Sequence, residues 1–437
     1  MPRLATLLTF LYVCALACSK DKGGNNHPIP PTPPKDSSLV NEAHLDHLYI
    51  PVSFPDGTQA AGIYIYSQYP DYILTEASGE GYTCVDDVSR AALYFARCPD
   101  LLTDTTKQSK LLNLMQFVVK MQSPSGYFYN FLQTGGSINM FGPTSAANPN
   151  WWSWRALQTL TEVLPVMRQL NPAFAGVIDL SIQKLLAVIK SDFIPLPKTT
   201  TVFNGVTIPT WLPAGSGTDQ GATLLLGLIN YVSQNPDTAI ISLIRKMSDG
   251  LMQMQKGDSS NYPYGMILSF QNNWHAYGAD QPFALLSAGD FLHDVSYQNA
   301  GFRMIDDYYS WFLANEFKSL ISVNEVNPVI SQISGNNYEQ IAYSFRPMVS
   351  ASVKAFQLSD DPKYADLAGR LASWFSGNND ASSIIYDPVT GICFDAISTG
   401  NNVNRNSGAE STIEALLTFE MVEANAAVKT AYLKFKK

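Results

Sequence analysis

The chain has 437 residues with a formal net charge of −9, and 15% of its residues are charged while 12% are aromatic. Nucleic acids bind basic surfaces, so this balance excludes nucleic acid as an expected partner. With only five His and without a CxxC or HExxH motif, the sequence also argues against a His/Cys metal centre. We therefore expect no metal and no cofactor.

The N-terminus predicts export. An apolar run, Leu4–Ala17, ends at Cys18 and is followed by polar residues. It is shorter than the ~20 apolar residues of a membrane-spanning helix, which indicates a signal peptide over residues 1–17. The junction resembles a bacterial lipobox and implies a lipid on Cys18, which would hold the protein at a membrane. Residues 18–40 are rich in Gly, Asn, Pro and Ser, as in a flexible linker.

Two locations follow from this N-terminus. The favoured one is the bacterial cell envelope, with the protein lipid-anchored on the periplasmic or surface face of the outer membrane. In the alternative, Cys18 is only a signal-peptide cysteine and the protein is freely secreted. Among the later cysteines, Cys84 and Cys98 flank a predicted helix and lie too far apart to bond each other. Cys393 could meet Cys84 in a disulfide, or all three could be buried thiols.

Residues 41–437 are expected to form one monomeric domain, because no second linker interrupts them. The domain opens with an irregular preface in which Leu48–Val52 and Gly62–Tyr66 look extended. From Asp86 onward, apolar residues recur with helical spacing.

Twelve helix-length segments follow and group into six pairs. They are Asp86–Arg97 with Lys107–Met121, Trp151–Leu164 with Ala175–Ser191, Thr218–Val232 with Thr238–Lys256, Tyr277–Leu292 with Tyr297–Phe317, Glu339–Leu358 with Pro362–Ser376, and Ser407–Val422 with Ala426–Lys436. This count predicts an all-α fold, an (α/α)6 toroid of six helical hairpins. An α-solenoid would give a similar count, but solenoid repeats share a consensus and a period, which these pairs lack.

The two members of each pair differ in composition. The first members are rich in small and apolar residues, as in Gly221–Leu228, whereas second members such as Tyr364–Arg370 carry more charge. A helix that is apolar on most faces is buried, and one with a polar stripe is half exposed. The first members are therefore predicted to form the inner ring.

Polar and aromatic residues gather where the inner helices begin. In a toroid these starts face one common funnel, so we take their side chains as candidate site residues. The candidates for catalysis are Asp87, Glu410 and Asp219, and those for substrate binding are Asp86, Trp151, Trp152, Arg155, Gln220, His275, Asp280, Tyr343 and Arg346. Aromatic faces stack on pyranose rings while polar side chains bond the hydroxyls, so this set is typical of a sugar-binding site.

Helix capping is the structural alternative for each of these acids. Asp86 or Asp219 alone could cap a helix, but two adjacent acids cannot both occupy one cap, which favours a functional role for Asp87. Glu410 could be the partner of Ser407 in a capping box.

Two segments carry a resemblance to a known family. Cys84–Ala91, and the closing stretch from Trp374 through Asp395 to the run Asn404–Thr412, resemble segments of bacterial helical-toroid proteins in the six-hairpin glycosidase-like superfamily. The matching segments bracket nearly the whole helical region. The resemblance implies the toroid fold and a carbohydrate context, with an oligo- or polysaccharide as the partner.

The expected function is glycoside hydrolysis by a pair of carboxyl groups. Asp87 and Glu410 form the predicted pair, because the sixth inner helix closes against the first, and Asp219 is the reserve. An inverting enzyme would place the two carboxyl groups roughly 6.5–9.5 Å apart.

Two alternatives remain open. A polysaccharide lyase would use His275, Tyr277, Tyr343 and Arg346 to abstract a proton and neutralise a uronate. A non-catalytic glycan-binding lipoprotein of a sugar-uptake system would need no acid pair.

Overall fold

The computed structural model describes residues 38–437 except Glu316 and Asn327. The predicted signal peptide, Cys18 and nearly all of the predicted linker lie outside the described residues. The described body begins at Ser38, and Leu39 is already buried in it.

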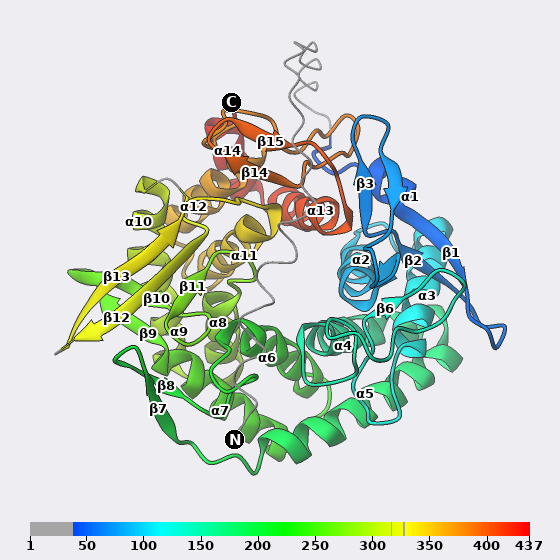
Figure 1. Ribbon diagram of the computed structural model, residues 1–437, viewed down its shortest axis with the longest axis horizontal. Coiled ribbons are helices and arrows are strands. Elements are labelled where there is room, and N and C mark those ends of the chain that lie inside the picture. The colour runs from blue at the N-terminus through cyan, green and yellow to red at the C-terminus, as the bar shows by residue number, and fades with distance from the viewer. Residues whose placement is uncertain (1–37, 316, 327) are drawn as a thin grey trace. The chain divides into compact units, whose positions relative to one another are not determined.

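Six inner helices surround the centre of the body (Figure 1). Each packs against the next, and the last packs against the first, so the ring is closed. The inner helices are α2 (Val85–Arg97), α4 (Trp151–Leu170), α6 (Thr218–Val232), α8 (Gln281–Leu292), α11 (Ala342–Ser359) and α13 (Ala409–Ala424). The predicted toroid is confirmed, and its closure excludes an open solenoid.

An outer helix follows each inner one along the chain and covers it from outside. The outer helices are α3 (Thr105–Lys120), α5 (Pro172–Phe193), α7 (Thr238–Gln253), α9 (Val295–Arg303) continued through the π-helical turn η3 (Met304–Tyr308) into α10 (Tyr309–Ala314), α12 (Pro362–Ala372) followed by the 3-10 turn η4 (Ser373–Phe375), and α14 (Ala426–Phe435). By length and composition α5 could cross a membrane. In this fold it is an outer helix packed on α4.

Burial follows the composition of the two rings. In α6 the run Leu224–Ile229 is buried throughout, whereas α12 buries mainly the face that carries Tyr364, Ala368 and Leu371. Close packing of the rings also needs glycine. A Cβ on Gly227 would lie 2.8 Å from Leu157 Cγ of α4, so a larger residue there would push α6 away from α4.

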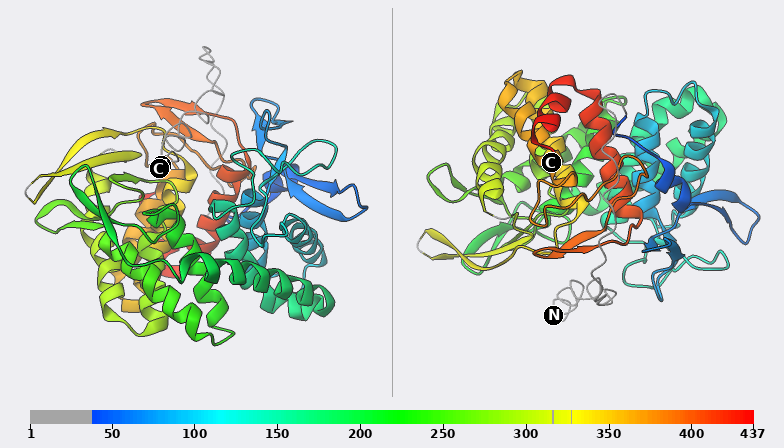
Figure 2. Two further views of the ribbon diagram at one scale, coloured as in Figure 1. Left: turned by 60° about the horizontal axis from the view of Figure 1, so that its bottom comes forward. Right: turned by 90° about the horizontal axis from the view of Figure 1, so that it is seen from above.

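Short antiparallel strands fill the loops before the inner helices, and the views from the side show them gathered at one face of the ring (Figure 2). They are β1 (Tyr49–Ser53), β2 (Gln59–Ile63), β3 (Tyr66–Gln68), β4 (Ile73–Thr75), β5 (Thr83–Cys84), β6 (Phe131–Leu132), β7 (Thr200–Phe203), β8 (Val206–Pro209), β9 (Gln255–Asp258), β10 (Asn261–Ile267), β11 (Asn273–His275), β12 (Leu320–Val326), β13 (Val329–Asn336), β14 (Ala396–Thr399) and β15 (Asn402–Asn404). The preface also contains a short helix, α1 (Ala43–Leu48), which the sequence did not predict.

The three cysteines of the body, Cys84, Cys98 and Cys393, are free and buried. Of the two alternatives left open by the sequence, the structure therefore has the buried thiols.

Candidate active site

Side chains from the starts of the inner helices meet in one charged cluster at the centre of the ring. We call this cluster the carboxylate–arginine floor. Its members are Asp86, Asp87, Arg90, Arg155, Asp280, Tyr343, Arg346, Glu410 and Glu414. Five helices, α2, α4, α11, α13 and the N-cap of α8, contribute to it.

Arg90 is the hub of the floor. Its Nη2 lies 3.0 Å from Asp86 Oδ2 and 3.1 Å from Glu410 Oε2, and its Nη1 lies 3.0 Å from Asp87 Oδ1. Its Nε lies 3.2 Å from Glu414 Oε1. One buried guanidinium thus joins the first inner helix to the sixth and brings the carboxyl groups of both helices together, as the ring closure predicted.

Arg155 and Arg346 extend the floor across the ring. Arg155 Nε lies 2.5 Å from Asp86 Oδ1, and Arg155 Nη2 donates to the hydroxyl of Tyr343 on the opposite side. Arg346 holds Asp280 through two hydrogen bonds of 2.7 and 3.1 Å and Glu414 through a third of 2.6 Å. Planar guanidinium groups suit such multidentate contacts.

Tyr343 lies between the three guanidinium groups. Their central carbons lie 4.7 Å (Arg90), 4.8 Å (Arg155) and 5.6 Å (Arg346) from the centre of its ring, within the range of cation–π attraction. Burial raises the pKa of the Tyr343 hydroxyl to about 12, although Arg155 and Arg90 oppose this rise. The hydroxyl therefore stays protonated at neutral pH.

The carboxyl groups of the floor differ in exposure. The Glu410 side chain is 42% exposed and that of Asp86 is 21% exposed, whereas Asp87 is 8% and Glu414 0% exposed. Surrounding protein atoms nevertheless desolvate the Glu410 carboxyl and raise its pKa to about 7, while Arg90 opposes the rise. Burial also raises the pKa of Asp87, again against Arg90. Glu410 and Asp86 are thus the acids of the floor that a ligand can best reach.

Glu410 does not form the capping box. The Ser407 N–H donates to the carbonyl of Ser67 (3.1 Å), and the N-cap of α13 is Gly408. The N–H of Gly408 and the hydroxyl of Ser411 donate to Asp395 Oδ1, at 2.8 and 2.6 Å. Much of the closing motif therefore fixes the start of α13, and it leaves Glu410 to face the floor.

Asp87 is held at the start of α2. Cys84 is the N-cap of this helix, and its thiol donates to Asp87 Oδ2 at 3.2 Å while Arg90 holds Oδ1. Both oxygens of Asp87 are therefore engaged inside the protein.

Asp219 and His275 form a separate pair beside the floor. His275 Nε2 lies 3.0 Å from Asp219 Oδ2, and His275 Nδ1 lies 2.7 Å from the carbonyl of Tyr277. Both ring nitrogens of this buried side chain face acceptors, and the ring stacks on Tyr277 at 3.8 Å. Asp219 is also buried and bonds the N–H of Gln220 (2.6 Å).

The three tryptophans at the start of α4 differ in burial. Trp152 is buried and its indole N–H donates to the carbonyl of Phe128 at 2.6 Å, so its burial argues against the predicted sugar contact. Trp154 is also buried and donates to Gln220 Oε1 (3.0 Å). Trp151 is only half buried and lies against Arg155, at 5.5 Å, so it is the tryptophan of the three best placed to meet a ligand.

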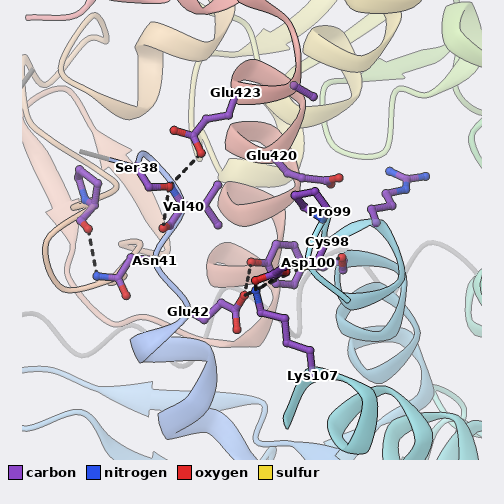
Figure 3. Close-up of a pocket in the computed structure, with 14 residues that line it drawn as sticks. Ser38, Val40, Asn41, Glu42, Cys98, Pro99, Asp100, Lys107, Glu420 and Glu423 are labelled. Carbon is purple, nitrogen blue, oxygen red and sulfur yellow. Dashed lines mark hydrogen bonds and ion pairs between the residues drawn. The ribbon is translucent and has the colours of Figure 1, made fainter. Parts of the chain in front are cut away.

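A hollow of about 790 Å³ lies at the other end of the seam between α2 and α13, away from the floor (Figure 3). Glu420, whose pKa burial raises to about 7, lines it, as do Glu42, Asp100 and Lys107. Lys107 bonds Asp100 at 2.8 Å and Glu42 at 3.0 Å. Glu420 lies ten residues beyond Glu410, or about 15 Å along the helix, so this hollow is distinct from the floor.

No metal centre accompanies either place. Among the described residues, no group of three or more His, Cys, Asp or Glu has an arrangement that could hold a metal ion.

Comparison with known proteins identifies the fold. No protein-family model matches the sequence, and no curated protein matches it. Solved structures do match. One is a sugar epimerase from a ruminal bacterium (TM-score 0.58, 10% identity, covering 83% of this chain and 92% of that one). Another is a family 76 glycoside hydrolase from a bovine Bacteroides thetaiotaomicron strain (TM-score 0.56, 10% identity, covering 89% of this chain and 78% of that one). A D-mannose isomerase also matches (TM-score 0.55, 12% identity, covering 91% of this chain and 100% of that one). The chain shares their helical-toroid fold.

The chain spans about half the length of a further neighbour, a GH127 β-arabinofuranosidase (TM-score 0.49, 12% identity, covering 77% of this chain and 51% of that one). At these identities the likeness is one of fold.

Proposed function

We propose that this protein is a glycoside hydrolase in which Glu410 is the general acid and Asp86 is the second carboxyl group of the catalytic pair. The single observation that carries the proposal is the Arg90 bridge, because Asp86 Oδ2 and Glu410 Oε2 both contact its Nη2. These two oxygens consequently lie no more than about 6 Å apart, which is less than the 6.5–9.5 Å between the carboxyl groups of an inverting enzyme.

The pKa of Glu410 suits its assignment as the acid. A general acid works best with a pKa near the working pH, and desolvation raises that of Glu410 to about 7. Asp86 contacts two guanidinium groups, of Arg90 and Arg155. The two carboxyl groups therefore differ in their surroundings: Asp86 contacts two guanidinium groups and Glu410 contacts one.

Geometry favours Asp86 over Asp87, which the sequence had assigned to the pair. Both acids contact protein groups through both carboxylate oxygens, but the Asp87 side chain is 8% exposed and that of Asp86 is 21% exposed, so a ligand reaches Asp86 more readily. We assign Asp87 the role of orienting Arg90. Asp219, the reserve acid, is committed to His275 and has no part in the proposed pair.

A lyase is less well supported by the same contacts. It would need a free base and a cation to neutralise a uronate. Both nitrogens of His275 face acceptors, and Arg346 is already paired with Asp280 and Glu414. The floor also holds five carboxyl groups against three guanidinium groups, which favours a neutral sugar over an anionic one.

The test is digestion of a panel of neutral and acidic glycans, followed by sizing of the products. New reducing ends from a neutral glycan are the expected result. A new ultraviolet-absorbing double bond from a uronate polymer would replace the proposal with a lyase. Binding without turnover on every glycan would favour a non-catalytic glycan-binding protein.

The cellular setting is a further part of the proposal. We infer a lipid-anchored protein of the bacterial cell envelope from the sequence around Cys18, and release of the Cys18→Ser variant from the membrane fraction tests it.

A further inference from the structure

Two tyrosine side chains stand exposed on and beside β3, outside the carboxylate–arginine floor. Tyr66, in the strand, is 39% exposed, and Tyr69, just after it, is 36% exposed. Aromatic side chains carry 150–250 Å² of mostly apolar surface each and are usually buried. Among the described Phe, Trp and Tyr side chains, Phe141 on the loop before α4 is the one other that is exposed, at 93%.

Hydrogen bonds join the β3–β4 hairpin, which carries the two tyrosines, to the start of α13. The Ala409 N–H donates to the carbonyl of Ile65 (2.9 Å), and the Tyr69 N–H donates to the side chain of Asn406 (3.0 Å). Glu410 follows Ala409 directly, and β3 lies beside α13 in the ring (Figure 1). The backbone that carries the two exposed tyrosines is therefore held at the start of α13, where the proposed general acid lies.

The turn after β3 holds Tyr69 in a fixed place. Tyr72 has a φ of +52°, in the left-handed region that side chains disfavour, and His47 Nε2 lies 2.7 Å from its carbonyl oxygen. Such strain persists where the surroundings determine the backbone conformation, and it is common at ligand sites. The Tyr69 ring packs against the Tyr72 ring, with 6.2 Å between their centres. The Arg405 guanidinium lies 5.7 Å from the centre of the Tyr69 ring.

We propose that Tyr66 and Tyr69 form a binding platform for the sugar units of an oligosaccharide beyond the linkage at Glu410. Exposed aromatic faces stack on the C–H faces of pyranose rings, and Arg405 at the end of the platform can donate to hydroxyl groups. The inference rests on the proposed function and names its substrate class. The substrate is a chain of several neutral sugars rather than a disaccharide.

The test compares chain lengths. The neutral glycan that the wild-type protein cleaves in the panel is supplied as a series from disaccharide to hexasaccharide. Tyr66→Ala and Tyr69→Ala should each raise KM for the hexasaccharide by roughly two- to tenfold, the range expected for one lost stacking contact. Neither change should alter KM for the disaccharide. Tyr66→Phe, which keeps the ring, should behave as the wild type.

Phe141→Ala is the control, because it removes an exposed ring, 93% accessible, from a different loop. An equal rise in KM in the control and in the tyrosine variants would overturn the platform, as would equal effects on the shortest and longest substrates.

If the wild-type protein cleaves no glycan, the proposed hydrolase fails and the platform is tested by calorimetric titration with panel hexasaccharides. Weaker binding by Tyr66→Ala than by Tyr66→Phe would then support the platform. Absence of any binding by the wild type, or equal binding by both variants, would overturn it.

Discussion

Replacement of Glu410 by Gln tests the proposed mechanism most directly. The change keeps the size of the side chain and its contact with Arg90, but it removes the transferable proton. A general acid contributes typically 10²–10⁴-fold to rate, so kcat on an unactivated oligosaccharide should fall by about that factor. KM should change far less, because the binding groups remain.

The pH dependence supplies a second measurement. With a pKa of about 7, Glu410 is half protonated at neutral pH, and about a tenth remains protonated one pH unit higher. Wild-type kcat should therefore fall about fivefold between pH 7 and pH 8 and about tenfold for each pH unit above that. The side-chain amide that Glu410→Gln introduces cannot titrate, so this basic limb should be absent from the variant.

An activated substrate separates chemistry from structural damage. An aryl glycoside with an acidic phenol as leaving group needs little protonation, so Glu410→Gln should retain most of its activity on that substrate. The assay compares phenol release with reducing ends from the unactivated chain. Equal losses on the two substrates, or a basic limb that persists in the variant, would refute the role of Glu410 as the acid.

The remaining predictions concern the acids around Arg90 and the N-terminus. Asp86→Asn should reduce turnover, measured as kcat, by at least tenfold more than Asp87→Asn. Asp87→Asn should instead lower the melting temperature more than Asp86→Asn. Glu414→Gln removes one partner of a fully buried ion pair and should destabilise the protein by about 3 kcal/mol in urea unfolding. Folding raises the pKa of Glu410, so its bound proton contributes to stability. This contribution is fully present below about pH 4.5 and is lost as the pH rises through about 7. The melting temperature of Glu410→Gln should therefore vary less between pH 5 and pH 8 than that of the wild type. Cys18→Ser should move the protein from the membrane fraction to the soluble fraction, and its continued sedimentation with membranes would contradict lipidation.

Helical periodicity was sufficient to predict the ring but not all of its boundaries. The inner helix α6 begins and ends where the sequence predicted, at Thr218 and Val232. The next inner helix begins at Gln281 rather than Tyr277, because Gly278 has a positive φ and Pro282 occupies the first turn. Apolar spacing alone does not record either constraint.

The strand hairpins in the body escaped prediction for a different reason. Of the described residues in the β12–β13 hairpin, only Ile321 and Val323 are buried, and seven of the eight residues of β13 are exposed, so apolar and polar residues alternate over no more than a few positions. Its position depends on β11, which pairs with β12 from a distant part of the sequence. Such long-range pairing is not visible in the local pattern.

Two members of the floor, Arg90 and Glu414, were missed although the sequence contained a signal for both. Arg90 follows Asp86 by four residues, and Glu414 follows Glu410 by four, so each pair shares one helix face. A search for charged residues one turn inside each inner helix would have found them. The contact between Arg155 and Tyr343 has no such signal, because it joins opposite helices and exists only once the ring has closed.

The charge of the floor connects these contacts to the chemistry. Five carboxyl groups share three guanidinium groups, so full ionisation of all five would leave two negative charges in a largely desolvated place. Retaining one proton relieves part of this repulsion, and Glu410, whose pKa is raised to about 7, is the acid that retains it. The same excess of carboxyl groups would repel a uronate. A site that retains a proton on Glu410 and disfavours anions is suited to protonating the leaving oxygen of a neutral glycoside.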